Sequence, residues 1–312
     1  MKKSIMQAAI LAALGISATQ ASATGFVTLP TSGTSAYVQC RVAGNFGSQS
    51  DNTLPTTTTD NACAILDVAS SPYNAVSTIN SVPETGYSLV VGSAVTSSIT
   101  AFSETVATLN ERVFRNATTG ECIYAKQVLM SSSTTHDYNP QLSGTQGLEV
   151  NDFAFGGYSG TVSAAYSKGN TSTLSSAYRI GRTFTSVQMQ SASPFTSPAT
   201  GYLVLPTAGG TAGTEINGVG QTLSPPGSPT AAQQQAPFSA NWVDYTVDTS
   251  GVADEDGFPN INSPIMYIKQ SCTSGSAPAL ANSFKIRQTG QESQPWVTIT
   301  TSSRAPGTTL TP

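Results

Sequence analysis

The chain has 312 residues, a formal net charge of −4 and a pI near 4.9, and only 10% of its residues are charged. A weakly acidic chain lacks the basic patch through which proteins bind nucleic acids and anionic lipid surfaces, so both partner classes are excluded. The charged fraction is far below the roughly 25% of ordinary globular domains, and Ser, Thr, Asn, Gln and Gly supply the polar surface instead, as is common in secreted β-proteins.

Residues 1–23 have the pattern of a secretory signal peptide. Lys2 and Lys3 form a basic start, residues 5–16 form an apolar core, and Ala21-Ser22-Ala23 is a cleavage motif. The apolar core is too short to be a permanent membrane anchor. We therefore expect a mature chain that begins at Thr24, has no transmembrane segment, and is secreted or held at the cell surface.

Short runs of β-branched and aromatic residues follow, separated by Gly, Pro, Ser and Thr. No run keeps a helical apolar period over three turns, so the sequence predicts an all-β, sandwich-like fold with long polar loops. We expect strands within residues 24–29, 36–42, 62–68, 87–91, 99–102, 112–130, 147–155, 161–166, 177–189, 238–247, 265–268, 284–286 and 296–299.

Residues 112–130 carry the clearest local signal, a β-hairpin. Two runs rich in β-branched and aromatic residues flank Ala117-Thr118-Thr119-Gly120. Gly120 can supply the positive φ that a tight connection requires. The second strand of this hairpin carries Cys122, which we expect to join the hairpin to a distant part of the chain.

The domain organisation follows from composition. Residues 24–205 form a sandwich-like body, residues 206–237 form a loop or linker rich in Pro, Gly and Gln, and residues 238–312 form a C-terminal β region that packs on the body. Three fragments recur in the same order, so a duplicated β-unit and independent strands both fit the chain. The matching fragments are 25–31 with 201–207, 123–127 with 266–270, and 151–155 with 282–286.

The mature chain contains four cysteines, Cys40, Cys63, Cys122 and Cys272. An even number in an oxidising compartment predicts two disulfides, with three possible connectivities. We favour Cys40–Cys63, which closes a local loop, and Cys122–Cys272, which joins two similar strands. A zinc site is disfavoured because there is no C-x-x-C pair and His136 is the only histidine.

The densest acidic cluster lies at residues 248–257 and contains Asp248, Asp254 and Asp256. Oxygen ligands with a following Gly are typical of calcium loops. However, the EF-hand spacing is not met, so an acidic solvated turn is the alternative interpretation. We expect no other cofactor.

Catalytic signatures are weak. His136-Asp137 could form a base with an orienting carboxylate, but the chain has no G-x-S-x-G nucleophile motif. An ordinary loop histidine is the competing interpretation. The sequence therefore predicts a protein without enzymatic activity.

Four aromatic residues towards the C-terminus have two interpretations. They can form an exposed platform for sugars, or they can be core residues of a β-sandwich. The four are Trp242, Tyr245, Tyr267 and Trp296.

Residues 114–124, 149–152 and 178–188 carry a family resemblance. Their words Phe-Arg-Asn-Ala-Thr-Thr-Gly-Glu-Cys-Ile-Tyr, Glu-Val-Asn-Asp and Tyr-Arg-Ile-Gly-Arg-Thr-Phe-Thr-Ser-Val-Gln resemble the choice-of-anchor F family of bacterial exported and surface proteins. The similarity covers mainly residues 110–190. It implies a surface or secreted location and no particular biochemical activity. That family carries C-terminal anchors, whereas residues 302–312 are polar and contain no anchor motif.

We therefore expect a non-catalytic surface or extracellular matrix protein, whose partners are further copies of itself or other surface components. A free strand at residues 24–29 could add to the sheet edge of a neighbouring copy and build filaments. The alternatives are a carbohydrate-binding adhesin, with glycans as partners, and a secreted hydrolase, which the missing catalytic motifs disfavour.

Overall fold

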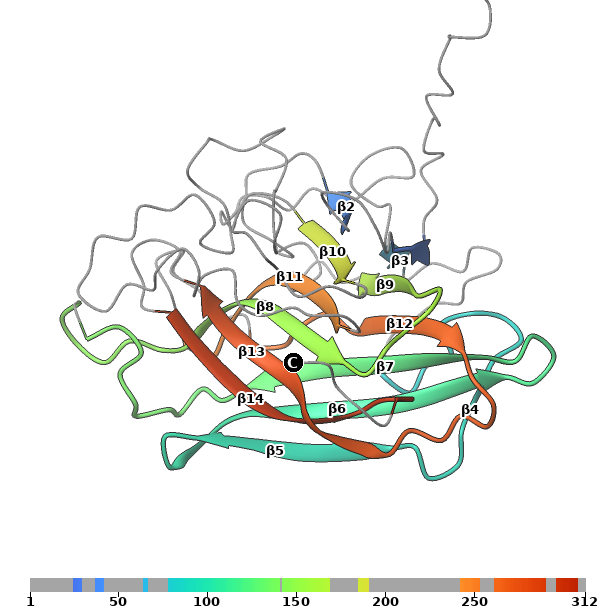
Figure 1. The fold of residues 1–312 in the computed structure, drawn as a ribbon. Coiled ribbons are helices and arrows are strands. Elements are labelled where there is room, and N and C mark those ends of the chain that lie inside the picture. Colours follow the sequence, from blue (N-terminus) through green and yellow to red (C-terminus); the bar gives the residue numbers. More distant parts are fainter. Residues whose placement is uncertain are drawn as a thin grey trace, which may run out of the picture.

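A computed structural model describes residues 25–29, 37–41, 64–66, 78–140, 142–168, 185–190, 242–252, 261–289 and 296–307. Within these residues the regular elements are strands, arranged in two sheets that pack face to face (Figure 1). The predicted all-β, sandwich-like fold is thus confirmed. In the described part of the chain, no helix has the length and apolar character needed to cross a membrane.

The first sheet, called sheet A, has eight strands in the order β1-β9-β12-β7-β6-β4, with β3 also paired to β9 and β5 also paired to β6. Its pairs are antiparallel except β3 with β9. The strands are β1 (Val27–Thr28), β3 (Ala64–Leu66), β4 (Ser88–Leu89), β5 (Val95–Ala101), β6 (Glu104–Asn116), β7 (Glu121–Met130), β9 (Ser163–Lys168) and β12 (Met266–Ser271).

The second sheet, called sheet B, has six strands in the order β14-β13-β8-β11-β10-β2, and all its pairs are antiparallel. Strands from after residue 238 are hydrogen-bonded into both sheets, because β11 and β13 flank β8 while β12 pairs with β7. The strands are β2 (Tyr37–Arg41), β8 (Glu149–Gly156), β10 (Thr185–Gln190), β11 (Trp242–Ser250), β13 (Ala279–Thr289) and β14 (Trp296–Arg304).

The hairpin formed by β6 and β7 lies within sheet A, as predicted. Its strands pair from Ala107 with Met130 to Asn116 with Glu121. Gly120 has a φ of +68°, a conformation that favours glycine. The side chain of Asn116 accepts hydrogen bonds from the backbone amides of Thr118 and Thr119 at 2.9 and 3.2 Å. The connection is therefore fixed by its own residues.

The main core lies between the two sheets. Alternate residues of β7, Cys122, Tyr124 and Val128, point toward sheet B and are fully buried. From sheet B, Phe155 stacks on Phe284 with ring centroids 4.6 Å apart. Burial of each such apolar side chain contributes about 1.5–3 kcal/mol.

The other face of sheet A carries a second cluster. It contains Phe114, Ile123 and Tyr267, each fully buried, with Ile79 and Tyr87 from the segment before β4. The central strands of sheet A are therefore covered on both faces. This explains why β7 is a nearly continuous buried run rather than a strictly alternating one.

The N-terminal strand is confirmed, although only Val27 and Thr28 are in ladder pairing. It is not free, because Val27 pairs with Ala164 of β9 and the amide of Leu29 donates to the carbonyl of Val162 at 2.9 Å. Leu29 is 2% exposed. The strand that we expected to add to a neighbouring copy is thus paired within its own protein, as the strand at one end of sheet A.

Candidate functional site

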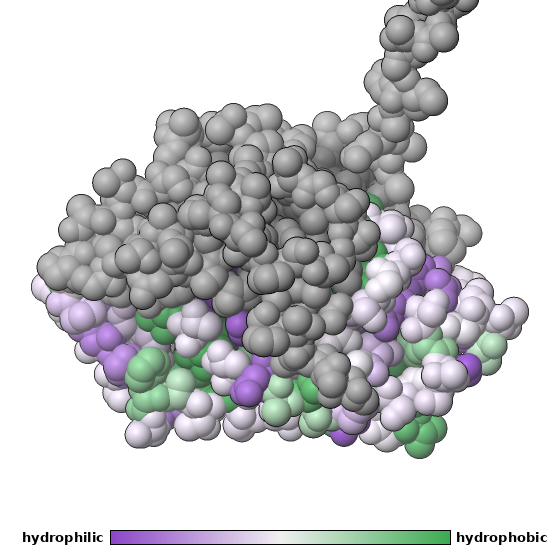
Figure 2. Space-filling model, in the orientation of Figure 1, coloured by the Kyte–Doolittle hydropathy of each residue, from purple (hydrophilic) through white to green (hydrophobic). Residues whose placement is uncertain are grey.

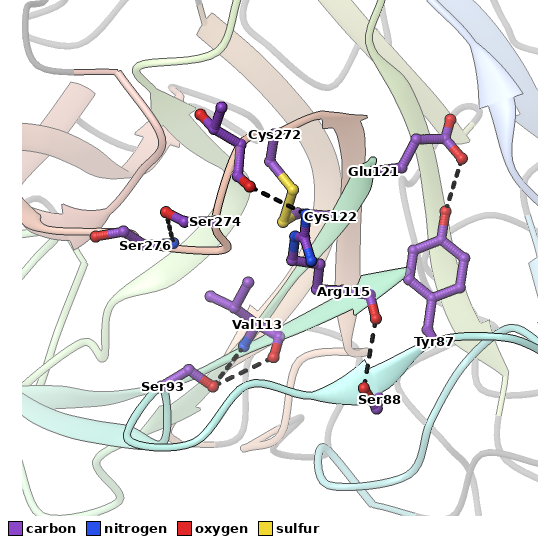
Figure 3. Close-up of a disulfide and its surroundings, with 11 residues drawn as sticks. Tyr87, Ser88, Ser93, Val113, Arg115, Glu121, Cys122, Cys272, Ser274 and Ser276 are labelled. Carbon is purple, nitrogen blue, oxygen red and sulfur yellow. Dashed lines mark hydrogen bonds between the residues drawn. A yellow bond between two sulfur atoms is a disulfide. The ribbon is translucent and has the colours of Figure 1, made fainter. Parts of the chain in front are cut away.

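A disulfide joins Cys122 at the start of β7 to Cys272 just after β12, across 150 residues of sequence (Figure 3). The two Cα atoms are 5.7 Å apart and Cys122 is fully buried. The amide of Cys272 donates to the carbonyl of Gly120 at 2.8 Å, and the guanidinium of Arg115 donates to the carbonyl of Thr273 at 3.0 Å. The predicted long-range bridge is confirmed, and it holds the turn of the hairpin against the end of β12.

A cluster of polar side chains lies beside this bridge. The Tyr87 hydroxyl donates to Glu121 Oε2 at 3.0 Å (Figure 3). Lys269 Nζ forms an ion pair with Glu84 at 2.9 Å and lies 4.6 Å from the centroid of the Phe26 ring. Burial and the nearby charges of Glu84 and Glu121 raise the pKa of Tyr87 well above its usual value. The phenol thus stays protonated and acts as a donor that fastens the segment before β4 to sheet A.

A buried ion pair lies inside the sandwich. Glu111 of β6 stands opposite Lys126 of β7, and the two side chains are 4% and 1% exposed. Lys126 Nζ donates to Glu111 Oε1, to the Ser303 hydroxyl at 2.9 Å and to the Arg304 carbonyl. Glu111 Oε1 also accepts the Ser303 hydroxyl at 3.1 Å and the Arg304 amide at 2.8 Å. The pair thus connects two strands of sheet A to β14 of sheet B.

The ionisation of this pair is set by its surroundings. Burial alone would raise the pKa of Glu111, but the charge of Lys126 and the hydrogen bonds from Lys126, Arg304 and Ser303 bring that pKa below its usual value. Burial lowers the pKa of Lys126, and Glu111 opposes that shift. Burial also raises the pKa of the adjacent core residue Tyr124 to about 12. The arrangement is that of a structural pair in which each charge is compensated by the other and by hydrogen bonds from within the protein.

An aromatic cluster occupies the turn between β5 and β6. Ala101 pairs with Glu104, so Phe102 and Ser103 form a two-residue connection, and both have positive φ, at 51° and 67°. Such a turn normally carries Asn and Gly. The Phe102 ring stacks on the His136 ring, with centroids 3.9 Å apart and planes at 2°.

The carboxylate of Glu104 holds the neighbouring loop in place. It accepts the amide of Thr135 at 2.6 Å and that of His136 at 3.2 Å, and the Thr135 amide is the main cause that lowers the pKa of Glu104. Asp137 Oδ1 accepts the amides of Asn139 and Gln146, both at 3.1 Å. The interpretation of His136 as an ordinary loop histidine therefore accounts for these contacts. The Asp137 carboxylate binds backbone amides of the loop, and the His136 ring packs on Phe102.

Ser103→Gly is expected to raise the free energy of unfolding by about 1 kcal/mol. A non-glycine residue in the left-handed region costs about 1–2 kcal/mol, and the greater freedom of glycine in the unfolded chain removes part of that gain. Urea unfolding of both proteins measures the difference. The control is Ser97→Gly in the extended strand β5, where we expect a loss of about 0.5–1 kcal/mol. A loss in Ser103→Gly would contradict the strain argument.

The other predicted site residues fall in two groups. Trp242 is 4% exposed, and Tyr245 and Tyr267 are fully buried, so these three are core or covered residues, as the alternative to a sugar platform predicted. The Tyr245 hydroxyl donates to the Tyr267 carbonyl at 2.6 Å and so connects the sheets. For the remaining residues, either the whole residue or its side chain lies outside the described part of the chain, so the predictions made for them stay predictions. They are Cys40, Cys63, Asp248, Asp254, Asp256, Trp296 and the linker 206–237.

Metal binding has no support in the part of the chain that the structure describes. No group of three or more His, Cys, Asp or Glu side chains in that part is placed to hold an ion. The calcium interpretation of residues 248–257 therefore stays a prediction, since residues 253–257 and the side chain of Asp248 lie outside the described part of the chain.

Sequence reasoning missed the Glu111–Lys126 pair and the Tyr87 cluster. A signal for the first was present. Lys126 follows Cys122 and Tyr124 at even spacing in a strand, which places its charge on the apolar face. The Tyr87 cluster had no such signal, because it joins segments that are far apart in the sequence.

Comparison with protein-family models, with curated proteins and with solved structures found no match to this chain.

Proposed function

We propose that this chain is an exported, non-catalytic protein of the cell surface or extracellular matrix, with a structural role and the capacity to self-associate. The signal peptide pattern of residues 1–23 supports the location. The ion pairs Glu111–Lys126 and Glu84–Lys269 serve stability in this proposal, since the charges of each pair compensate one another.

The observation that carries the proposal is the Cys122–Cys272 disulfide, in which Cys122 is fully buried. Disulfides form and persist in oxidising compartments and are rare in the cytosol. This one ties the central strand β7 to its hydrogen-bonded neighbour β12. Such a bond protects a protein that must persist outside the cell.

Fractionation of the producing cells tests the location. We expect the protein in the medium or on the cell surface, with Thr24 at its N-terminus and with Cys122 and Cys272 in one non-reduced peptide. Electron microscopy of the purified mature protein then tests assembly. Full-length protein in the cytosol with reduced cysteines would refute the export proposal.

One observation favours a carbohydrate-binding adhesin as the second candidate. The Phe102 ring is 53% exposed and is held against His136 on a tight turn, which is a geometry suited to stacking on a sugar ring. A monodisperse protein that binds a glycan array, and loses that binding in Phe102→Ala, would favour the adhesin over the structural role.

A further inference from the structure

We propose that β5 is the surface through which two copies of this chain pair, edge to edge and antiparallel about Ser98, so that sheet A continues from one copy into the other. The inference rests on the proposed self-association and names its surface. Its partner is a second copy of this chain.

The first argument is that β5 is an open edge. It pairs with β6 along one side, and no strand of the described residues pairs with its other side. Figure 1 shows β5 as the outermost strand at the bottom of the molecule. At the opposite end of sheet A, β1 and β3 both pair with the outer side of β9. An open edge exposes unpaired N–H and C=O groups that can accept another strand.

The second argument is that β5 lacks the usual protection against such pairing. Natural edge strands are blocked by charged residues, by proline, by β-bulges or by very short length. β5 is seven residues long, Val-Thr-Ser-Ser-Ile-Thr-Ala, and contains no charged residue and no proline. Its pairing with β6 has one irregularity, between Ile99 and Thr100, where the extra residue is Val106 of β6 and not a residue of β5. On the face shown in Figure 2, hydrophobic residues lie in small separate patches, so backbone pairing is a more suitable mode of association than docking of a large apolar surface.

The third argument is that β5 is self-complementary. In an antiparallel pair centred on Ser98, Thr96 stands opposite Thr100 of the other copy, and Val95 stands opposite its Ala101. Opposed threonines are favourable cross-strand neighbours, whereas a charged strand would meet its own charge about a two-fold axis. Thr96, Ser98 and Thr100 are exposed and lie on one face of the strand.

The fourth argument concerns the two ends of β5. Val91 is 99% exposed on the turn before the strand, and Phe102 is 53% exposed on the turn after it. The two-fold pairing brings the Val91 turn of one copy to the Phe102 turn of the other, where the contact removes apolar surface from water. The first turn is fixed, because the Ser93 hydroxyl donates to the Val113 carbonyl at 3.2 Å and accepts the Val113 amide at 3.1 Å.

The first experiment measures the mass of the exported protein by light scattering over a concentration series. We expect a dimer for the native chain and a dissociation constant at least about tenfold higher for Ser98→Lys, since two ammonium groups would then face each other. The control is Ser302→Lys, an exposed position on β14, the edge strand of sheet B, which should leave the dimer unchanged. Circular dichroism checks that both variants fold.

The second experiment tests the register by cysteine cross-linking under non-reducing conditions. Ser98→Cys should give a covalent dimer, since residue 98 faces itself at a Cα distance that a disulfide can span. Thr96→Cys and Thr100→Cys should each stay monomeric on the gel when alone, and should cross-link when the two variants are mixed. Peptide mapping checks that Cys122–Cys272 is intact in each variant.

The outcomes are separable from those of the proposed function. A native protein that stays monomeric at about 100 μM, a Ser98→Lys variant that dimerises like the native chain, or cross-linking of Thr96→Cys alone would each overturn the β5 interface. A cytosolic, reduced protein would refute the proposed export without bearing on β5 pairing.

Discussion

Replacing Cys122 and Cys272 together by serine is expected to lower the free energy of unfolding by about 5 kcal/mol in the chain-entropy account of disulfides. The bond closes a loop of 150 residues, so its removal greatly enlarges the ensemble of unfolded conformations. It also releases the core contacts of the fully buried Cys122. Urea unfolding of the native and variant proteins, purified without reductant, measures the loss.

The matched control is the shorter predicted bridge. Cys40→Ser with Cys63→Ser would open a loop of about 24 residues, for which the same account gives about 3 kcal/mol. The larger loss should therefore come from the Cys122–Cys272 variant. A loss below about 1 kcal/mol for that variant, or equal losses for the two, would show that loop length does not set the stabilisation.

Removing one member of the Glu111–Lys126 pair is expected to cost about 3–5 kcal/mol. Lys126→Met leaves the Glu111 carboxylate buried without its cation, and Glu111→Gln leaves the ammonium without its anion. Removing both, in Glu111→Leu with Lys126→Met, should recover much of the loss, because the desolvation of both charges disappears as well. The double-mutant cycle measured by urea unfolding gives the coupling.

The same pair predicts how stability depends on pH. The pKa of Glu111 is lower in the folded protein than its usual value, so the unfolded chain binds this proton more readily. The stabilisation from Glu111 is therefore present above the unfolded pKa of about 4.3 and is lost as pH falls through the lower folded value. The stability difference between native protein and Glu111→Gln should narrow below about pH 4. A difference that stays constant down to pH 2 would contradict this assignment.

The features that sequence predicted are local or carry a specific chemical constraint. The hairpin at residues 112–130 followed from strand-forming runs around Gly120, whose φ of +68° is the conformation that the prediction required. The Cys122–Cys272 bridge followed from an even cysteine count and from the likeness of residues 123–127 to 266–270. These two stretches are hydrogen-bonded neighbours in the centre of sheet A, so their side chains are buried in similar surroundings, which accounts for their similar sequences.

The features that sequence did not predict depend on long-range strand order. β5 is an edge strand because sheet A ends there, and the residues Val95–Ala101 carry no signal of their position in the sheet. The expected free strand at residues 24–29 looked available because its partner, β9, lies more than 130 residues away. A charged residue in a strand normally faces solvent, so the burial of Lys126 required Ser303 and the Arg304 carbonyl, which come from the far end of the chain.

The position of the Cys122–Cys272 bond has a consequence for proteolysis. The bond encloses β8, β9, β10, β11, β12 and nearly all of β7 in one covalent ring of the chain. A protease that cuts once anywhere between Ile123 and Ser271 therefore opens the ring without releasing a fragment. The nicked protein keeps its mass under non-reducing conditions and separates into two pieces only after reduction. Outside a cell, where proteases are common and reductants are scarce, one cut would leave the two sheets still joined.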